Sequence, residues 1–331
     1  MKILITGASG FIGSFIVEEA LKRGFETWAA VRKTSSKRYL RDERINFIEL
    51  DFDDEARLTE QLRPHRFDYV VHAAGVTKCA NHQDFYRVNT EGTKHFVNAL
   101  LALEMPLKKF VYMSSLSIYG PIRDSIPHLD ILLSDAPHPN TDYAKSKLMA
   151  ESYIRKLRDK LNYTILRPTG VYGPRETDYF MMVKSIKKHS DFAVGYSQQD
   201  ITFVYVSDVV QAVFLALEQQ KSGGKYFLTD GEVYSSRDFS DMIREELGNP
   251  WWIRITAPVW LLRVICTVGE LWGKITGKVT ALNMDKFHIL SQRNWRCDVG
   301  AAIHELGYEP QVKLREGVKL SIEWYKENGW I

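Results

Sequence analysis

The stretch Thr6-Gly7-Ala8-Ser9-Gly10-Phe11-Ile12-Gly13 joins an apolar segment at 2–6 to a helical pattern at 11–23. Gly7 permits a tight turn with positive φ, and Gly10 lets backbone N–H groups approach a pyrophosphate at a positive helix end. Gly13 lets the helix pack closely against the strand. An ordinary glycine-rich loop is the alternative, but this strand–turn–helix context favours a dinucleotide-binding turn. The expected contacts are Gly7, Ser9, Gly10, Phe11, Ile12 and Gly13.

Around this turn, strand-like apolar segments alternate with longer helical patterns. The strand-like segments are 2–6, 26–32, 45–50, 67–73, 109–114 and 163–167, and the helical ones are 11–23, 85–104 and 143–161. Such alternation is typical of right-handed βαβ units and a parallel sheet. It predicts an α/β fold: a Rossmann-type doubly wound parallel sheet with a smaller C-terminal α+β substrate lobe. Sheets of this kind bind ligands at the carboxyl ends of their strands.

The alternation becomes irregular after Pro168. Segments 203–206 and 225–228 still resemble strands, with a helical pattern at 207–218 between them, and we expect both strands to return to the main sheet. Two units follow, each built from two segments: a dinucleotide-binding domain of 1–168 and 203–230, and a substrate-binding lobe of 169–202 and 231–331.

The composition excludes several classes of protein. The chain has 331 residues, of which 45% are hydrophobic and 26% charged, as in an ordinary globular protein. Its 44 Lys and Arg residues against 41 Asp and Glu residues leave a formal net charge of +3, which does not suggest a nucleic-acid partner. The three cysteines form no CxxC pair, and the nine histidines show no metal-ligand spacing. We therefore expect no disulfide framework and no metal.

The most hydrophobic stretch is 251–275. Arg254, Pro258, Arg263 and Glu270 interrupt it, so we do not expect it to span a membrane. The apolar run near the N-terminus is too short for a signal peptide, and we expect a cytoplasmic protein. Weak peripheral membrane contact by this stretch stays open. The stretch contains four tryptophans, Trp251, Trp252, Trp260 and Trp272. They could line an apolar substrate pocket, pack in the core, or form a surface that contacts a membrane or a partner.

The end of the second predicted strand indicates which dinucleotide binds. An NAD site usually places Asp or Glu there for the ribose hydroxyls, whereas this strand ends Val31-Arg32-Lys33 and is followed by Lys37 and Arg38. The forked guanidinium of Arg32 suits a 2′-phosphate. We expect NADP(H) to be preferred, with NAD(H) as the alternative cofactor and a solvated basic loop as the non-functional interpretation.

Asp51 follows the third predicted strand and has two interpretations. Its carboxylate either accepts a hydrogen bond from the adenine amino group or caps a helix that begins near Glu55. The residues alone do not separate these roles.

Three residue types suggest catalysis. Ser114 and Ser115 follow a predicted strand, and Tyr143 and Lys147 lie four apart on one helix face. A nearby ammonium lowers the pKa of a phenol, so Tyr143 is expected to exchange a proton with a substrate oxygen while Lys147 tunes it. Ser115 is expected to hold that oxygen by a hydrogen bond. Alone, a YxxxK pair is common on helix surfaces; its order after the glycine turn and the strand-end serine favours catalysis.

These motifs resemble the extended short-chain dehydrogenase/reductase superfamily, often labelled the NAD-dependent epimerase/dehydratase family. The resemblance covers nearly the whole chain and rests on TGASGFIG at 6–13, LDFDD at 50–54, HAAG at 72–75, VNTEGT at 88–93, SSLSIYG at 114–120, YAKSK at 143–147, LRPTGVYGPR at 166–175 and VYVSDVVQA at 204–212. It implies catalytic roles for Ser115, Tyr143 and Lys147. It also implies that Asn89 orders the helix supporting the site and that Pro168 lies near the nicotinamide. The remaining cofactor contacts that we expect are Lys33, Phe52, Ala73, Ala74, Gly75 and Ser114.

Two features favour the hydroxysteroid, sterol and dihydroflavonol branch of that superfamily over the nucleotide-sugar branch. Ile201 stands where epimerases usually carry an arginine for the sugar-nucleotide pyrophosphate, and Arg32 and Lys33 resemble the NADP-binding strand end of the dihydroflavonol reductases. Leu116 after Ser115 leaves out the acidic residue of the dehydratases. We expect hydride transfer to or from a carbonyl or secondary alcohol of an apolar, steroid- or flavonoid-like molecule.

Two alternatives remain. A nucleotide-sugar epimerase or reductase would need phosphate contacts from Arg175, Lys184 and Lys187, and a non-catalytic nucleotide-binding protein would leave the catalytic residues unused. The resemblance also implies a homodimer, because extended members often pair through two long helices, here 85–104 and 143–161.

Overall fold

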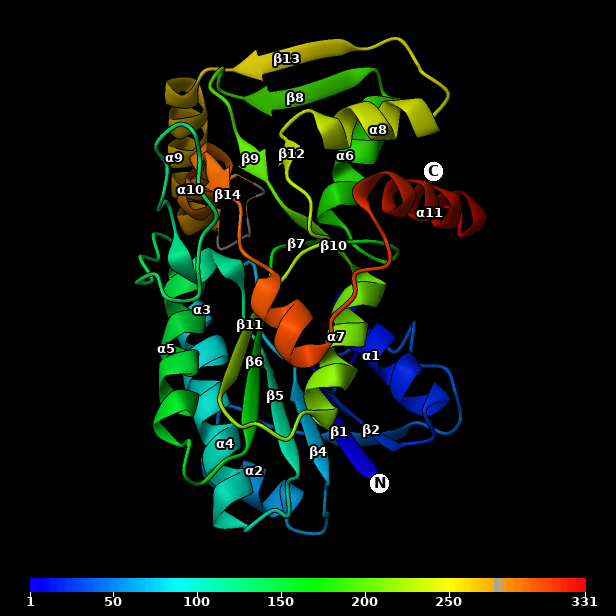
Figure 1. Cartoon of the computed structure of the whole chain (residues 1–331), viewed down its shortest axis with the longest axis vertical. Helices are drawn as coiled ribbons and strands as arrows, with labels where there is room; N and C mark the ends of the chain where they lie inside the picture. Colours follow the sequence, from blue (N-terminus) through cyan, green and yellow to red (C-terminus); the bar gives the residue numbers. More distant parts are fainter. Residues whose placement is uncertain (277–279, 281) are drawn as a thin grey trace.

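The computed structural model describes residues 1–276, 280 and 282–331. Its main sheet contains seven strands: β1 (Lys2–Thr6), β2 (Glu26–Val31), β3 (Asn46–Glu49), β4 (Tyr69–His72), β5 (Lys109–Met113), β6 (Tyr163–Pro168) and β11 (Gly224–Leu228). They are all parallel and lie in the order β11-β6-β5-β4-β1-β2-β3 (Figure 1). The chain reverses its direction of travel across the sheet between β1 and β4, which is where doubly wound sheets bind ligands. The predicted fold class is confirmed.

Helices cover both faces of this sheet because its strands are apolar on both faces. In β1, Ile3 and Ile5 pack on one side with α1 (Phe11–Lys22) and α7 (Val206–Glu218). Leu4 points to the opposite side, where it joins the core formed with α2 (Glu55–Leu62), α4 (Gly92–Ala102) and α5 (Asp142–Lys156). The alternation of side chains along a strand thus builds two separate cores.

The long helix expected at 85–104 has three parts. A short turn α3 (Gln83–Phe85) leads into a π-helix η1 (Tyr86–Glu91), which continues as α4. The π-helix contains the buried Asn89, whose amide oxygen accepts a hydrogen bond from Val76 N at 2.8 Å. Single π-turns are frequent at functional sites, and no sequence periodicity announces them.

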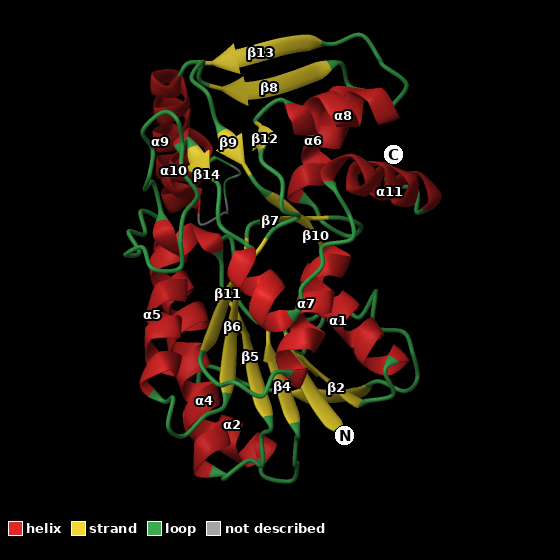
Figure 2. Ribbon diagram, in the orientation of Figure 1, coloured by secondary structure: helices red, strands yellow, loops and turns green. Residues whose placement is uncertain are grey.

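A second lobe lies above the carboxyl edge of the sheet (Figure 2). Its strands are β7 (Gly170–Tyr172), β8 (Ser190–Val194), β9 (Asp200–Ile201), β10 (Phe203–Tyr205), β12 (Tyr234–Ser235), β13 (Ile253–Ala257) and β14 (Asn294–Trp295). They form three small sheets: β10-β7, β12-β9-β14 and β13-β8. The remaining helices are η2 (Leu116–Tyr119), α6 (Asp178–Lys187), α8 (Asp238–Glu246), α9 (Val259–Thr276), α10 (Met284–Ser291), η3 (Ala302–Leu306) and α11 (Leu314–Glu327).

One of the two strands expected to return to the main sheet does so. Segment 225–228 becomes β11, at the edge beside β6. The expectation for 203–206 is wrong, because β10 pairs with β7 instead. Phe203 and Tyr205 pack in an aromatic cluster with Tyr172 and Phe239, and this burial holds β10 in the upper lobe. The division of the chain into two units stays a prediction.

Candidate functional site

The glycine turn needs glycine at two of its positions. Gly7 has φ +68°, and a Cβ there would lie 2.6 Å from the carbonyl group of Ala73 at the end of β4. A Cβ on Gly13 would lie 2.1 Å from the carbonyl oxygen of Gly7. The turn, the first helix and the neighbouring strand end therefore approach one another more closely than any side chain allows. The N-terminus of α1, beginning after Gly10, points its free N–H groups at this edge of the sheet.

A cavity of about 550 Å³ opens beside this turn. It is lined by most of the residues expected to bind the dinucleotide: Gly7, Ser9, Gly10, Arg32, Lys33, Asp51, Phe52, Ala73, Ala74 and Gly75. The guanidinium of Arg32 has no ion-pair partner within the described part of the chain, whereas Lys33 Nζ lies 3.9 Å from Glu49. An unpaired cation at the end of β2 and a cradle too tight for a Cβ both fit a phosphorylated dinucleotide.

Lys37 and Arg38 do not line this cavity. Lys37 Nζ lies 3.9 Å from the centre of the Phe47 ring, and Arg38 lies over Tyr39. The basic run therefore divides, and only its first two residues face the cavity.

Asp51 lines the dinucleotide cavity and does not cap the following helix. The cap of α2 is Asp54, whose carboxylate accepts a hydrogen bond from Arg57 N at 3.1 Å. Asp51 is bound instead by the Arg57 guanidinium at 2.9 Å. The capping interpretation is wrong for Asp51, and the adenine contact stays a prediction.

Six expected cofactor residues lie around the cavity without lining it: Phe11, Ile12, Gly13, Asn89, Ser114 and Pro168. Asn89 is fully buried and donates to Ser146 Oγ and Val76 O, both at 3.0 Å. It therefore ties η1 to α5, in line with the supporting role that the resemblance implies. Ser114 Oγ is buried without a hydrogen-bond partner in the described structure. An unpaired buried hydroxyl is a group that a bound ligand can satisfy.

The expected catalytic residues come from two elements that meet at the sheet edge. Ser115 follows β5 and caps η2, with its Oγ accepting from Ser117 N at 3.1 Å. Tyr143 and Lys147 lie in the first turns of α5, which Thr141 caps. Lys147 Nζ donates to Met113 O at 2.8 Å and lies 3.2 Å from the position that a Cβ of Gly75 would take. The ammonium thus reaches from α5 to the border of the dinucleotide cavity.

Burial sets the pKa values of both groups on α5. It raises the pKa of Tyr143 to about 12, while a hydrogen bond with Ser115 acts in the lowering direction. Burial lowers the pKa of Lys147 to about 8, against the raising effect of the Glu151 carboxylate. The expected lowering of the Tyr143 pKa by Lys147 is not present in this arrangement, because desolvation of the phenolate dominates.

A second cavity, of about 360 Å³, extends from Ser115 and Tyr143 into the upper lobe. It is lined largely by apolar side chains, among them Tyr179, Met182, Phe192, Ile201 and Trp295. None of its twenty described lining residues is Lys, Arg, Asp or Glu. Periodicity did not single out most of these residues, because the cavity is assembled from short strands and loops.

The four tryptophans of 251–275 differ in burial. Trp251, Trp260 and Trp272 are exposed, so both the pocket and the core interpretations are wrong for them. Trp252 is partly buried against the aromatic cluster of the upper lobe. Within the described residues, no helix is long and apolar enough to cross a bilayer.

The cations considered for a sugar diphosphate do not line the second cavity either. Arg175 binds Glu18 at 2.5 Å and Ser14 Oγ at 2.9 Å, on the face of α1. Lys184 and Lys187 lie on α6 outside the cavity wall. None of the three cations therefore supplies a phosphate contact in this cavity.

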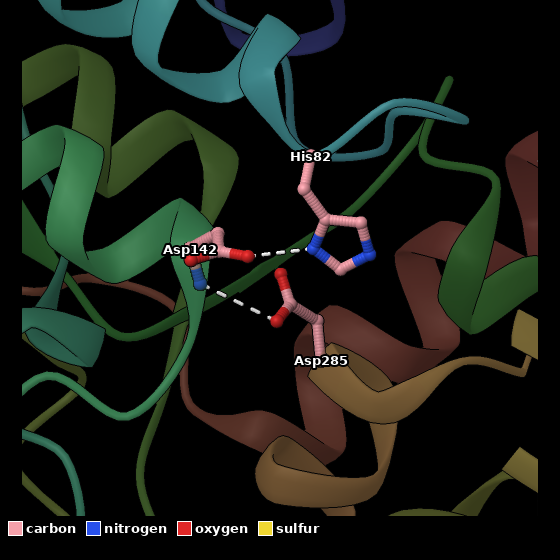
Figure 3. Close-up of side chains that lie close together, drawn as sticks. All are labelled: His82, Asp142 and Asp285. Carbon is pink, nitrogen blue, oxygen red and sulfur yellow. Dashed lines mark hydrogen bonds and ion pairs between the residues drawn. The ribbon is translucent and has the colours of Figure 1, made fainter. Parts of the chain in front are cut away.

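One polar cluster next to the site escaped the sequence analysis. The cluster consists of His82, Asp142 and Asp285 (Figure 3). Each offers one atom that could bind a metal ion, and these three atoms lie within 4.8 Å of one another. His82 Nδ1 lies 2.6 Å from Asp142, and Asp142 N donates to Asp285 at 3.3 Å. These contacts fix the residue that precedes Tyr143. Because the three residues are far apart in the chain, no spacing rule could have found them; the absence of a metal stays a prediction.

The parallel sheet, its glycine turn and the two adjoining cavities define a Rossmann-type dinucleotide-dependent enzyme. The chain belongs to the NAD dependent epimerase/dehydratase family, whose model matches residues 3–233. It is therefore an enzyme of the extended short-chain dehydrogenase/reductase type.

The relatives include both a hydroxysteroid dehydrogenase and nucleotide-sugar epimerases. The chain is 29% identical to the 3beta-hydroxysteroid-dehydrogenase/decarboxylase isoform 1 of Arabidopsis thaliana, over 86% of this chain and 67% of that one. It is 26% identical to the UDP-glucose 4-epimerase of Vibrio cholerae, over 96% and 93%. The solved UDP-glucose 4-epimerase of Thermotoga maritima with UDP-glucose superposes with a TM-score of 0.81, 24% identity and 99% coverage of both chains. That likeness shows the fold alone.

Proposed function

We propose that the protein is an NADP(H)-preferring oxidoreductase that transfers hydride to or from a carbonyl or secondary alcohol of an apolar small molecule. The observation that carries this proposal is the uncharged, mainly apolar lining of the cavity that begins at Ser115 and Tyr143. A sugar diphosphate would bring two negative charges into a space whose described lining has no Lys or Arg side chain, and burying them unpaired is costly.

The preference for NADP(H) rests on Arg32. Its guanidinium lines the dinucleotide cavity and has no ion-pair partner in the described structure. The carboxylates on this side are already paired, since Asp51 binds Arg57 and Asp53 binds Arg87 at 2.6 Å. A ribose 2′-phosphate would supply the missing anion for Arg32.

The roles of the three catalytic candidates follow from their positions. When bound, the dinucleotide supplies or accepts the hydride. Tyr143 holds the proton that its phenol exchanges with the substrate oxygen, and the Ser115 hydroxyl fixes that oxygen by a hydrogen bond. The Lys147 ammonium lies beside Gly75 of the dinucleotide cavity, and we assign it the support of the phenolate that forms during proton transfer. Because burial raises the Tyr143 pKa to about 12, the phenol is protonated at neutral pH and ready to donate to a carbonyl.

The test is a comparison of two ligand classes with the purified protein. We expect oxidation of NADPH with a panel of ketosteroids and other bulky apolar ketones or aldehydes. We expect no binding of UDP- or dTDP-sugars by calorimetry. Turnover of no apolar compound, together with binding of a nucleotide sugar and a tightly retained NAD, would favour a nucleotide-sugar epimerase or reductase, the activity that relatives such as the Vibrio cholerae protein carry in their names.

We also propose a cytoplasmic homodimer that pairs through η1, α4 and α5. The outer side of α5 carries the exposed Met149, and Leu101 and Tyr153 nearby are partly buried. Light scattering would give the mass of a dimer, and Met149→Glu would reduce it to that of one chain.

A further inference from the structure

Helix α9 exposes its apolar side to solvent. The exposed side chains are between 43% and 79% accessible: Trp260, Val264, Ile265, Val268, Leu271, Trp272 and Ile275. The opposite side of the helix, with Leu262, Cys266 and Gly273, is buried. An amphipathic helix of a globular protein normally turns its broader apolar side inward. We call the seven exposed residues the α9 face.

The exposed apolar surface continues beyond α9. Strand β13 leads directly into α9 through Pro258 and pairs with β8 at the outer end of the upper lobe (Figure 1). Ile253 and Ile255 on β13 are 59% and 44% exposed, and Phe192 on β8 is 64% exposed. Single exposed apolar side chains are ordinary, but this many of them on consecutive elements usually marks an interaction surface.

We propose that the α9 face binds peripherally to an anionic lipid bilayer. The helix is not long and apolar enough to cross one, so it would lie in the interfacial plane with its apolar side in the acyl region. Trp260 and Trp272 stand near its two ends, and indole rings prefer the boundary between headgroups and acyl chains.

Charge favours an anionic surface over a second copy of the chain. In sequence, residues 251–280 contain four Lys or Arg residues and one Glu. Arg254 is ion-paired with Asp191 and Asp241. Within the described structure, Arg263 is exposed on α9, and Lys187 and Lys188 are exposed just before β8, at the end of that strand away from α9. A two-fold contact through the α9 face would bring Arg263 near its own copy, whereas each cation near an anionic bilayer contributes attraction. The apolar side chains and the excess of cations therefore fit the same partner.

Elements that neighbour α9 line the second cavity. Phe192 lines that cavity and is also exposed, and Ile289 and Leu290 of α10, which packs against α9, line the same cavity. The binding itself does not depend on which reaction the enzyme performs.

The experiment measures co-sedimentation of the full-length protein with vesicles. The vesicles contain either phosphatidylcholine alone or an equal mixture of phosphatidylcholine and phosphatidylglycerol. We expect binding to the anionic vesicles that weakens with added salt, and much weaker binding to the neutral ones. The double variant Val268→Glu/Leu271→Glu, in the centre of the α9 face, should reduce the partition coefficient by about tenfold or more.

The matched control is Phe47→Glu/Ile303→Glu, which places the same charges at exposed apolar positions away from the α9 face. It should bind vesicles nearly as well as the wild type. Circular dichroism and dinucleotide binding establish that each variant is folded. A second measurement needs no destabilising change: brominated lipids should quench tryptophan fluorescence of the wild type, and Trp260→Phe/Trp272→Phe should lose most of that quenching.

The absence of vesicle binding by the wild type would overturn the proposal. So would equal binding by the wild type and the α9-face variant. If the variant instead converts a dimer into single chains and vesicles have no effect, the α9 face is a contact between copies and the lipid proposal is wrong.

Discussion

The two cavities of this enzyme differ in charge. The cavity beside the glycine turn, about 550 Å³, is lined by ionisable side chains of both signs, among them Arg32, Asp51, Arg57 and Arg87. The cavity that begins at Tyr143, about 360 Å³, has no Lys, Arg, Asp or Glu in its described lining. The first suits a charged ligand with several phosphates, and the second suits a neutral one.

The charged side chains line the dinucleotide cavity, and the proton exchange is expected beside the uncharged one. Lys147 is buried beside Gly75 and Met113, and Tyr143 is partly buried at the wall of the second cavity. A proton exchanged at Tyr143 therefore moves in a region with little water, where a hydrogen bond or a single ammonium has a large effect. The contrast between the two cavities can be tested at four places: Tyr143, the glycine turn, Arg32 and the titration of Lys147.

The largest expected effect is on kcat, from removal of the Tyr143 hydroxyl. Tyr143→Phe removes the proton donor without changing the ring, so kcat should fall by about 10²- to 10⁴-fold. The dissociation constant of NADPH should change little, because the phenol hydroxyl lies outside the dinucleotide cavity. Stopped-flow and steady-state turnover measure the first quantity, and fluorescence titration the second.

The matched variant is Tyr179→Phe, since Tyr179 also lines the second cavity but belongs to α6. It should alter the KM for substrate more than kcat. Full activity of Tyr143→Phe would contradict the assignment and would favour a non-catalytic dinucleotide-binding protein.

The second prediction concerns the glycine turn. Gly13→Ala places a methyl group 2.1 Å from the carbonyl oxygen of Gly7, so the turn must shift. We expect a loss of about 1–3 kcal/mol in the free energy of unfolding, with weaker NADPH binding. Gly10→Ala is the control, because its Cβ would lie 3.1 Å from the same oxygen and require a smaller shift. Equal urea midpoints for Gly13→Ala and the wild type would show that the close approach costs nothing.

The third prediction concerns Arg32 and the choice between NADPH and NADH. Arg32→Ala should raise the Kd for NADPH by about tenfold or more and leave the Kd for NADH nearly unchanged, since a lost charge-assisted contact costs about 1.5–3 kcal/mol. Lys37→Ala is the control, because Lys37 lies over Phe47 and outside the cavity. An unchanged ratio of the two dissociation constants in Arg32→Ala would remove the basis for an NADP preference.

Local sequence predicted the parts of this molecule that depend on local geometry. The turn at 6–13 lies between β1 and α1 as expected, because positive φ and close packing leave a direct trace in glycine spacing. The pairing of Tyr143 and Lys147 on one helix follows equally from the helical repeat.

Long-range contacts left no such trace. The strand β10 resembles a main-sheet strand in sequence, but the aromatic residues around Phe203 hold it in the upper lobe. The Tyr143 pKa depends on burial among elements distant in the chain, and the lowering expected from its helical neighbour Lys147 is not present. The cluster of His82, Asp142 and Asp285 is likewise assembled by tertiary structure alone.

The smallest predicted effect is the pH dependence of stability that comes from Lys147. Its pKa is about 8 in the folded protein and near 10.5 in an unfolded chain. Between these values the unfolded chain binds more protons, so the free energy of unfolding rises with pH. From pH 7 to pH 9 this contribution amounts to about 1 kcal/mol. The difference between the wild type and Lys147→Met in urea unfolding should therefore shift by that amount in favour of the wild type. The subtraction cancels other titrating groups, including Lys109, whose pKa burial also lowers to about 8. A constant difference across this range would mean that the ammonium is well solvated, and the burial of Lys147 beside Gly75 would then be wrong.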